Sequence, residues 1–313
     1  MGLYGDNFLK IRNQHVLPLV SYGIARKKYQ YWSFKDIITK NVISLNKLQG
    51  KSVEVEISKS DYYRALHCEI ELFMNKATIQ YADYIKSQTS SPSWSFVTLY
   101  YLTFFSTTCF FRFLNRGFIF FSSEQIKRLE DFSQAVYSDV ISLDSGNYYF
   151  NLKETTETDT VIITLTFKGD NIHKQNWIQL EATFREMLAD CDETEETIIK
   201  TFISHFAAFK TEYPSWLRNR LNYNSDSSIL DLEASVMHVD LSSFRSDFLK
   251  GLVGVDLTPD MNSQIASIGF LSSYLLGFIT ELYKEYLQRS EHGKDFSLER
   301  KIYLENNNIK QDY

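Results

Sequence analysis

Proline is scarce in this chain, and its scarcity limits the folds that the chain can adopt. Four of the 313 residues are proline, and none lies between Pro18 and Pro92 or between Pro92 and Pro214. Because proline breaks helices in their interior, long stretches without it favour long helices. A hydrophobic content of 44% can fill one large core or two modest ones. We therefore expect a folded, mainly α-helical protein.

Hydrophobic periodicity predicts three long helices. After Ser60, apolar residues recur at helical spacing as far as Lys86, which is typical of an amphipathic helix. Residues 94–115 are apolar on almost every face, as in a central helix, and the following Arg116-Gly117 would end it. A third long helix is expected at 262–288. Shorter helices are predicted at 122–140, at 172–189, at 195–210 and from Pro214.

Short β-strands are expected in two parts of the chain. Alternating apolar residues predict a strand at 52–58, and two more are expected at 15–25 and 28–34. Residues 148–152 and 160–167 flank a polar connection and predict a β-hairpin. The resulting division is a small basic β-containing N-terminal element at 1–56, a helical domain at 57–291 with the hairpin near 147–168, and a mobile tail at 292–313.

Several function classes are disfavoured by the composition. Cys68, Cys109 and Cys191 are too few and too scattered for a disulfide framework or a zinc site, and we expect neither a metal nor a cofactor. No apolar segment preceded by positive charge opens the chain, so we expect no secretory signal. Residues 94–111 and 261–280 lack charge over nearly the length that spans a bilayer. Because polar residues interrupt both stretches, we interpret them as core helices of a cytoplasmic protein that binds no membrane.

Positive charge is concentrated near the N-terminus. Residues 10–51 contain nine Lys and Arg residues against Asp36 alone, although the whole chain has a net charge of -6. Arg26, Lys27 and Lys28 run directly into Tyr29, Tyr31 and Trp32, a mixture that can hold phosphates and stack bases. This segment predicts an RNA-binding surface. The alternative is that the cations pair with acidic residues elsewhere in the same chain.

The densest polar group in a predicted helix is Trp216-Leu217-Arg218-Asn219-Arg220-Leu221-Asn222-Tyr223. Two guanidiniums and two amides within so few residues are costly to bury and well suited to binding phosphate. Arg218 and Asn222 are four residues apart, as are Asn219 and Tyr223, so each pair can touch. A structural role is the alternative, in which the polar side chains hold neighbouring loops while Trp216 and Leu221 anchor the helix.

Two further segments complete a pattern with Arg218-Asn219 and Tyr223. The first is the aromatic stretch 94–105, which contains Tyr100-Tyr101, and the second opens the helix at His173 and Trp177. Together the three segments resemble the HEPN superfamily (higher eukaryotes and prokaryotes nucleotide-binding domains), which are all-helical modules of prokaryotic toxins and antiviral systems. The resemblance covers about residues 57–225 and implies a HEPN-like helical bundle. Taken singly, the tyrosine pair is more often a feature of core packing, and His173 is more often a satisfied histidine at a helix start than a base. His205 lies among phenylalanines in the sequence, as a core residue does.

Active HEPN proteins are metal-independent ribonucleases that work as dimers, with a motif of arginine, a polar residue, a short spacer and histidine. The resemblance implies a catalytic set and an RNA-binding set. The catalytic set is Arg218, Asn219 and Tyr223, and the RNA-binding set is Arg220, Asn222, Arg26, Lys27 and Lys28. The expected partners are RNA, a second copy of the chain, and a protein of the same defence or toxin system.

Tyr223 stands where the family has its histidine, and this departure affects the expected chemistry. Positions 218 and 223 are about 140° apart on a helix, so a straight helix cannot turn both toward one substrate. Tyrosine, with a reference pKa near 10, is also a poor base at pH 7, whereas histidine with a pKa near 6.5 is a good one. We therefore expect weak cleavage or none. The alternative function is a non-catalytic helical module for interaction or dimerisation.

Overall fold

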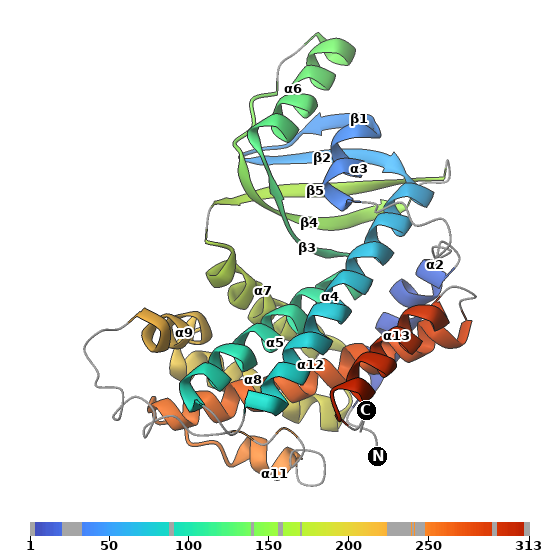
Figure 1. Ribbon diagram of the computed structural model, residues 1–313. Coiled ribbons are helices and arrows are strands. Elements are labelled where there is room, and N and C mark those ends of the chain that lie inside the picture. The colour runs from blue at the N-terminus through green and yellow to red at the C-terminus, as the bar shows by residue number, and fades with distance from the viewer. Residues whose placement is uncertain are drawn as a thin grey trace.

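The protein is mainly helical and contains one small antiparallel sheet, as predicted (Figure 1). The computed structural model describes residues 4–20, 33–87, 91–138, 141–155, 159–169, 171–223, 239, 241, 248–289 and 293–309. The helical elements are α1 (Asp6–Ile11), a π-helical turn (Arg12–Val16), α2 (Leu17–Val20), α3 (Phe34–Lys40), α4 (Lys59–Ser87), α5 (Pro92–Phe113), α6 (Ser123–Tyr137), α7 (Ile172–Met187), a 3-10 turn (Leu188–Asp190), α8 (Glu193–Phe209), α9 (Tyr213–Tyr223), α11 (Phe248–Val253), α12 (Met261–Arg289) and α13 (Gly293–Asn306).

Three long helices, α4, α5 and α12, form the centre of the helical layer (Figure 1). All three were predicted from periodicity. The central α5 is buried on most of its surface, from Phe96 to Phe113, because it packs against both α4 and α12. A capping serine, Ser91, accepts a hydrogen bond from the backbone N–H of Trp94 and fixes the start of α5.

Within the described residues, five strands form one sheet in the order β1-β2-β5-β4-β3. Their bounds are β1 (Val42–Lys47), β2 (Ser52–Ser58), β3 (Arg116–Phe121), β4 (Gly146–Thr155) and β5 (Thr160–Gly169). The predicted hairpin is confirmed as β4 and β5, and the predicted strand at 52–58 is β2. Since β2 pairs with β5 along its whole length, the N-terminal strands β1 and β2 and the β4–β5 hairpin belong to the same sheet. The helices α3 and α6 pack against this sheet. Buried residues alternate along β2 and β5, so one face of the sheet contributes to the core.

The strand expected at 15–25 is wrong for its described part. Residues up to Val20 are helical, in the π-helical turn and α2. Ile11, Val16 and Leu19 face the core and pack toward α12 and α4. The five-residue step from Ile11 to Val16 matches a π-helical turn and not the period of an α-helix, which explains why helical periodicity was not recognised. Phe34, expected in a strand, opens α3.

Two strands were not predicted, and one predicted helix end is wrong. β1 has only one buried residue, Leu45, and β3 follows α5 after a short turn.

Asn115, not Gly117, ends α5, with a φ of 55° that asparagine tolerates. Gly117 lies in β3 at a φ of 141°, where a Cβ would overlap the Arg112 guanidinium. The glycine is therefore needed for close contact between β3 and α5.

The segment expected to be a mobile tail contains α13, which packs against α4 and α12 (Figure 1). Arg300 of α13 is buried and donates to Glu71 of α4 at 2.7 Å.

Of the two uncharged stretches, the one in α12 is long and apolar enough to cross a bilayer, but 72% of the most apolar 18-residue segment of α12 is buried inside the protein. Within the described ranges α12 is accordingly a core helix of this fold.

Candidate functional site

The helix that carries the polar motif, α9, is fixed by two buried leucines. Leu217 and Leu221 are one helical turn apart and both point into the core. Trp216, expected as an anchor, is instead 52% exposed, because it lies off the face of α9 that buries Tyr213, Leu217 and Leu221. Pro214 occupies the first turn, where its missing N–H costs nothing. This placement brings Ser215 and Arg218, three residues apart, onto the side of α9 that faces α5 and α7.

Arg218 lies against the paired tyrosines of α5. Its Nη1 donates to the Tyr101 hydroxyl at 3.3 Å, and its guanidinium carbon lies 5.3 Å from the Tyr100 ring centre and 5.8 Å from that of Tyr101. Its Nε is buried and has no hydrogen-bond partner. Arg218 forms no ion pair within the described part of the chain; the nearby Glu212 pairs with Lys174 at 3.1 Å. The guanidinium is thus held by aromatic rings and keeps unused donor capacity.

A chain of hydrogen bonds links the same tyrosine pair to α7. The Tyr100 hydroxyl lies 2.9 Å from His173 Nδ1 and 3.3 Å from Ser215 Oγ. Ser215 Oγ accepts a hydrogen bond of 2.8 Å from Trp177 Nε1. His173 also packs on Phe104, with ring centres 4.8 Å apart. Three helices that are distant in sequence therefore contribute to one cluster, which we call the Arg218 cluster: Tyr100, Tyr101, His173, Trp177, Ser215 and Arg218.

The environment of the Arg218 cluster keeps its histidine neutral. Burial lowers the pKa of His173, and the positive charge of Arg218 lowers it further. Burial raises the pKa of Tyr100, which stays protonated. At pH 7 the cluster therefore combines one permanent cation with a neutral imidazole. An arginine of this kind can bind a phosphate group, and a neutral imidazole can accept a proton.

Most of the remaining polar residues of the motif are exposed on α9. Asn219 and Arg220 are exposed, and Arg220 stacks over the exposed Trp216 ring at 5.5 Å. Asn222 is half-buried, and Tyr223, at the end of α9, is 75% exposed. The structure thus brings His173, rather than Tyr223, to Arg218 within one chain.

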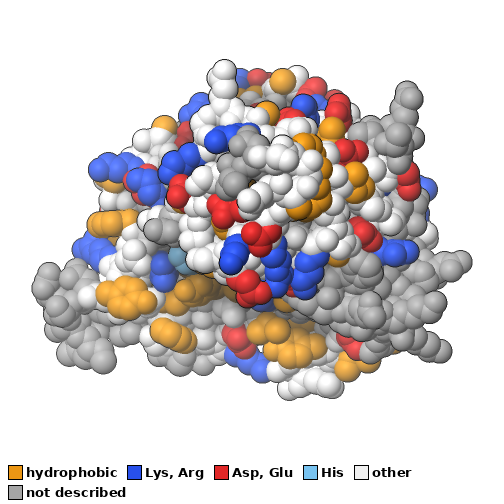
Figure 2. Space-filling model, turned by 90° about the horizontal axis from the view of Figure 1, so that it is seen from above, with side chains coloured by type: hydrophobic (Ala, Val, Ile, Leu, Met, Phe, Trp, Pro, Cys, Tyr) orange, Lys and Arg blue, Asp and Glu red, His pale blue; other side chains and the backbone are white. Residues whose placement is uncertain are grey.

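The basic N-terminal segment is mostly paired in its described part. Lys10, Arg12 and Lys51 form ion pairs with Asp190, Glu285 and Asp144, each distant in sequence. Figure 2 shows Lys and Arg side chains intermixed with Asp and Glu side chains over the face seen from above. These pairs agree with the alternative in which the cations contact acidic residues of the same chain. Arg26, Lys27 and Lys28 lie outside the described residues.

Sequence reasoning singled out most of the Arg218 cluster but missed Ser215. The only signals for this residue were its place beside Pro214 and its three-residue step to Arg218. The expected structural role of His205 is confirmed, because it is buried and bonds Ser267 at 2.8 Å. In the portion of the chain that the structure describes, no group of three His, Cys, Asp or Glu side chains could hold a metal ion.

Comparison with protein family models, with curated proteins and with solved structures gave no match to this chain. The geometry of the Arg218 cluster is therefore the main basis for a functional interpretation.

Proposed function

We propose that this protein binds RNA at the Arg218 cluster and cleaves it without a metal, as a HEPN-like effector of a prokaryotic antiviral or toxin system. One observation carries the proposal: half-buried Arg218, which has no acidic partner among the described residues, lies close enough to His173 to lower its pKa. A guanidinium binds phosphate oxygens in a bidentate manner and stabilises the extra negative charge of the transition state. The three segments that resemble HEPN proteins supply five of the six residues of the cluster, all except Ser215.

In the proposed reaction, His173 takes the role that the resemblance gives to the missing histidine. With Nδ1–H donating to Tyr100, His173 Nε2 accepts the proton of the ribose 2′-hydroxyl. The 2′-oxygen attacks phosphorus, the bond to the 5′-oxygen breaks, and the leaving oxygen takes a proton from water. The products are a 2′,3′-cyclic phosphate and a free 5′-hydroxyl. Asn219, Arg220 and Tyr223, exposed on α9, would contact the flanking nucleotides.

Labelled single-stranded RNA, incubated with the protein in EDTA, tests this proposal. Arg218→Ala should lower binding and also slow cleavage by about 100-fold or more, since removal of one charge-stabilising donor typically has this effect. His173→Asn retains a polar atom near the Nδ1 position but removes Nε2, so RNA binding should persist while cleavage is lost. Arg128→Gln on α6, an exposed arginine paired with Glu124, is the matched control.

Two outcomes would contradict the proposal. A wild-type protein that neither binds nor cuts RNA would refute it entirely. Equal binding and cleavage by wild type and Arg218→Ala would place any RNA activity elsewhere on the molecule. Cleavage that survives in His173→Asn but not in Arg218→Ala would retain the site and reject the proposed proton acceptor.

A second candidate function, an interaction or dimerisation module, is favoured by exposed aromatic side chains. Trp94 on α5 is 61% exposed, Trp216 is 52% exposed and Tyr223 is 75% exposed. Tryptophan and tyrosine are enriched at the centres of protein interfaces. Since α5 packs against α9, we propose that these side chains contact a second copy of the chain.

Size-exclusion chromatography with light scattering tests the dimer. The wild type should have about twice the 36.6 kDa mass of the chain. The double variant Trp94→Ser, Trp216→Ser should shift toward the monomer, because losing buried aromatic anchors typically weakens association by 2 kcal/mol or more, about 30-fold. Val136→Ser, an equally exposed position on α6, should remain dimeric. A monomeric wild type would exclude a homodimer while leaving the RNA proposal open.

A further inference from the structure

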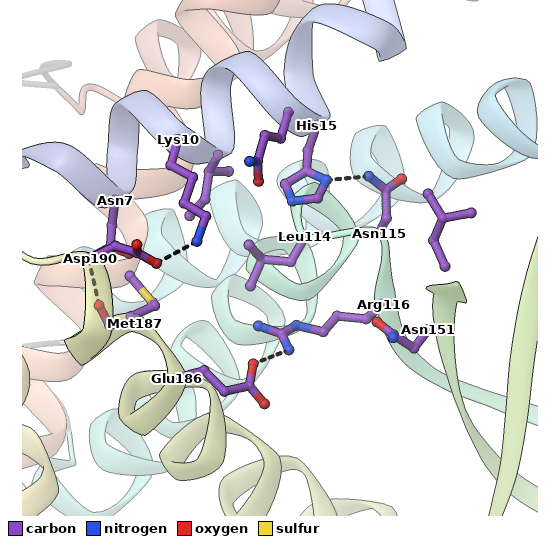
Figure 3. A pocket seen from close by; sticks show the side chains of 13 residues that line it. Asn7, Lys10, His15, Leu114, Asn115, Arg116, Asn151, Glu186, Met187 and Asp190 are labelled. Carbon is purple, nitrogen blue, oxygen red and sulfur yellow. Dashed lines mark hydrogen bonds and ion pairs between the residues drawn. The ribbon is translucent and has the colours of Figure 1, made fainter. Parts of the chain in front are cut away.

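A polar cavity of about 270 Å³ lies where the N-terminal helices meet the sheet (Figure 3). Its walls come from α1, the π-helical turn, the turn between α5 and β3, β4, and the C-terminal end of α7. Glu186, at this end of α7, is thirteen residues from His173, which corresponds to about 20 Å along the helix. The cavity is therefore a site distinct from the Arg218 cluster.

The hydrogen bonds of His15 fix its tautomer. Tyr62 donates its hydroxyl proton to Asn115 Oδ1 at 3.1 Å, so the other side-chain atom of Asn115 is the NH₂ group. This group donates to His15 Nδ1 at 2.7 Å. In a neutral imidazole whose Nδ1 accepts, Nε2 carries the proton. His15 Nε2–H thus has no acceptor in the described part of the chain, and His15 lies on the cavity wall (Figure 3).

His15 is neutral at pH 7. Burial, together with the positive charges of Arg116 and Lys10, lowers the pKa of His15 to about 4. Both cations line the same cavity as His15.

Each of the two cations that line the cavity is paired with one carboxylate of the cavity wall. Arg116 pairs with Glu186 at 2.6 Å and Lys10 pairs with Asp190 (Figure 3). The side chains of Lys10 and Asp190 are both 44% exposed, and such surface pairs contribute little to stability. The Arg116 side chain is 14% exposed, but its partner Glu186 is 58% exposed, so the anion of a ligand can compete with this carboxylate. His15 Nε2–H adds a donor that has no acceptor among the described residues.

We propose that this cavity binds a small ligand through a carboxylate or phosphate group that accepts hydrogen bonds from His15 Nε2, Arg116 and Lys10. Leu114, Ile11 and Met187 also line the cavity and provide apolar contact for the rest of the ligand. The volume suits a compact molecule, since it lies at the lower end of the range for ligand pockets. The carboxylates of Glu186 and Asp190 compete with the ligand for the two cations.

Isothermal titration calorimetry with benzoate, phenyl phosphate and neutral benzyl alcohol tests this site. Both anions should bind at least about tenfold more tightly than the alcohol, because hydrogen bonds to charged groups are strong. The ratio between benzoate and phenyl phosphate distinguishes a carboxylate ligand from a phosphate ligand. His15→Asn keeps an acceptor for Asn115 but removes Nε2–H, so it should weaken anion binding about tenfold.

Glu186→Gln should have the opposite effect, since it frees Arg116 and removes a competing charge. We expect anion affinity to rise several-fold in this variant. The control is Arg128→Gln, which removes a cation on α6, outside the cavity, and should bind the anions as tightly as the wild type does. In an Arg218→Ala background, His15→Asn and Glu186→Gln should change anion affinity by the same factors as in the wild type, which separates this site from the proposed RNA site. The proposal is overturned if benzyl alcohol binds as tightly as the anions, if no probe binds, or if His15→Asn and Glu186→Gln leave anion affinity unchanged.

Discussion

Glu71 is only 2% exposed, in a location where an isolated carboxylate is strongly disfavoured. Burial opposes its ionisation, but the hydrogen bond from His67 and the charge of Arg300 outweigh burial and lower the pKa of Glu71. Tyr283 also donates to its Oε1, and Arg300 Nη1 donates to its Oε2 at 2.7 Å. The buried carboxylate thus connects α4, α12 and α13 through paired and hydrogen-bonded charge.

Glu71→Gln should therefore destabilise the fold by about 3–5 kcal/mol, because it leaves the buried Arg300 without its anion. Urea unfolding at pH 7.5 measures the change. Glu281→Gln, which breaks an exposed pair with Lys284 on α12, should cost no more than about 1 kcal/mol. Equal effects of the two substitutions would show that the Glu71–Arg300 pair contributes nothing beyond a surface ion pair. A double variant, Glu71→Gln with Arg300→Met, should recover part of the loss, since it removes the orphaned charge.

Individual residues of the Arg218 cluster were predictable to different degrees. Arg218 was recognisable because two guanidiniums in one short helix are unusual, and His173 because it opens a helix with Trp177. Their proximity was not predictable from the residues alone, since it depends on how α5, α7 and α9 pack. The resemblance to HEPN proteins implied a catalytic role for Tyr223, and that role remains a prediction. The tertiary structure makes His173 the alternative, because a proton acceptor need not lie on the same helix.

Among elements, prediction was reliable for long helices and poor for short segments. α4, α5 and α12 were each predicted to within a few residues, because many consecutive turns repeat the same apolar pattern. The residues before Val20 were misassigned because the π-helical turn shifts the spacing of the buried residues. β1 and β3 are short edge strands whose character depends on pairing with β2 and β4, which sequence periodicity does not reveal.

α13 illustrates the same limit for a whole element. Its polar composition and the adjacent asparagines predicted a tail, since few apolar residues were visible. Its contact with the rest of the molecule depends on Leu304, Ile309 and the buried Arg300. A buried arginine cannot be recognised from sequence without its partner, and Glu71 lies more than two hundred residues away. Long-range charge pairing therefore fixed an element that local pattern could not.

At the scale of the whole molecule, buried His205 and half-buried His15 should make stability depend on pH, and His173, whose pKa is also lowered, acts in the same direction. Burial lowers the pKa of His205 to about 4. Burial, together with the positive charges of Arg116 and Lys10, lowers the pKa of His15 to about 4 as well. In the unfolded chain both should titrate near 6.5. Between these values the unfolded state binds more protons than the native state, so stability rises with pH from about 4 to 6.5 and is lost as pH falls through this window.

The free energy of unfolding should therefore be lower at pH 5.0 than at pH 7.5 by about 2 kcal/mol for each of His205 and His15. Carboxylates contribute little here, because those with a lowered pKa, such as Glu71 and Glu212, lose their contribution only below about pH 4.5. Urea unfolding at both pH values measures the loss, and His205→Gln should reduce it by about 2 kcal/mol. Ser204→Ala, on the exposed side of the same helix, should leave it unchanged. Equal stability of the wild type at the two pH values would mean that neither histidine is held neutral by the fold.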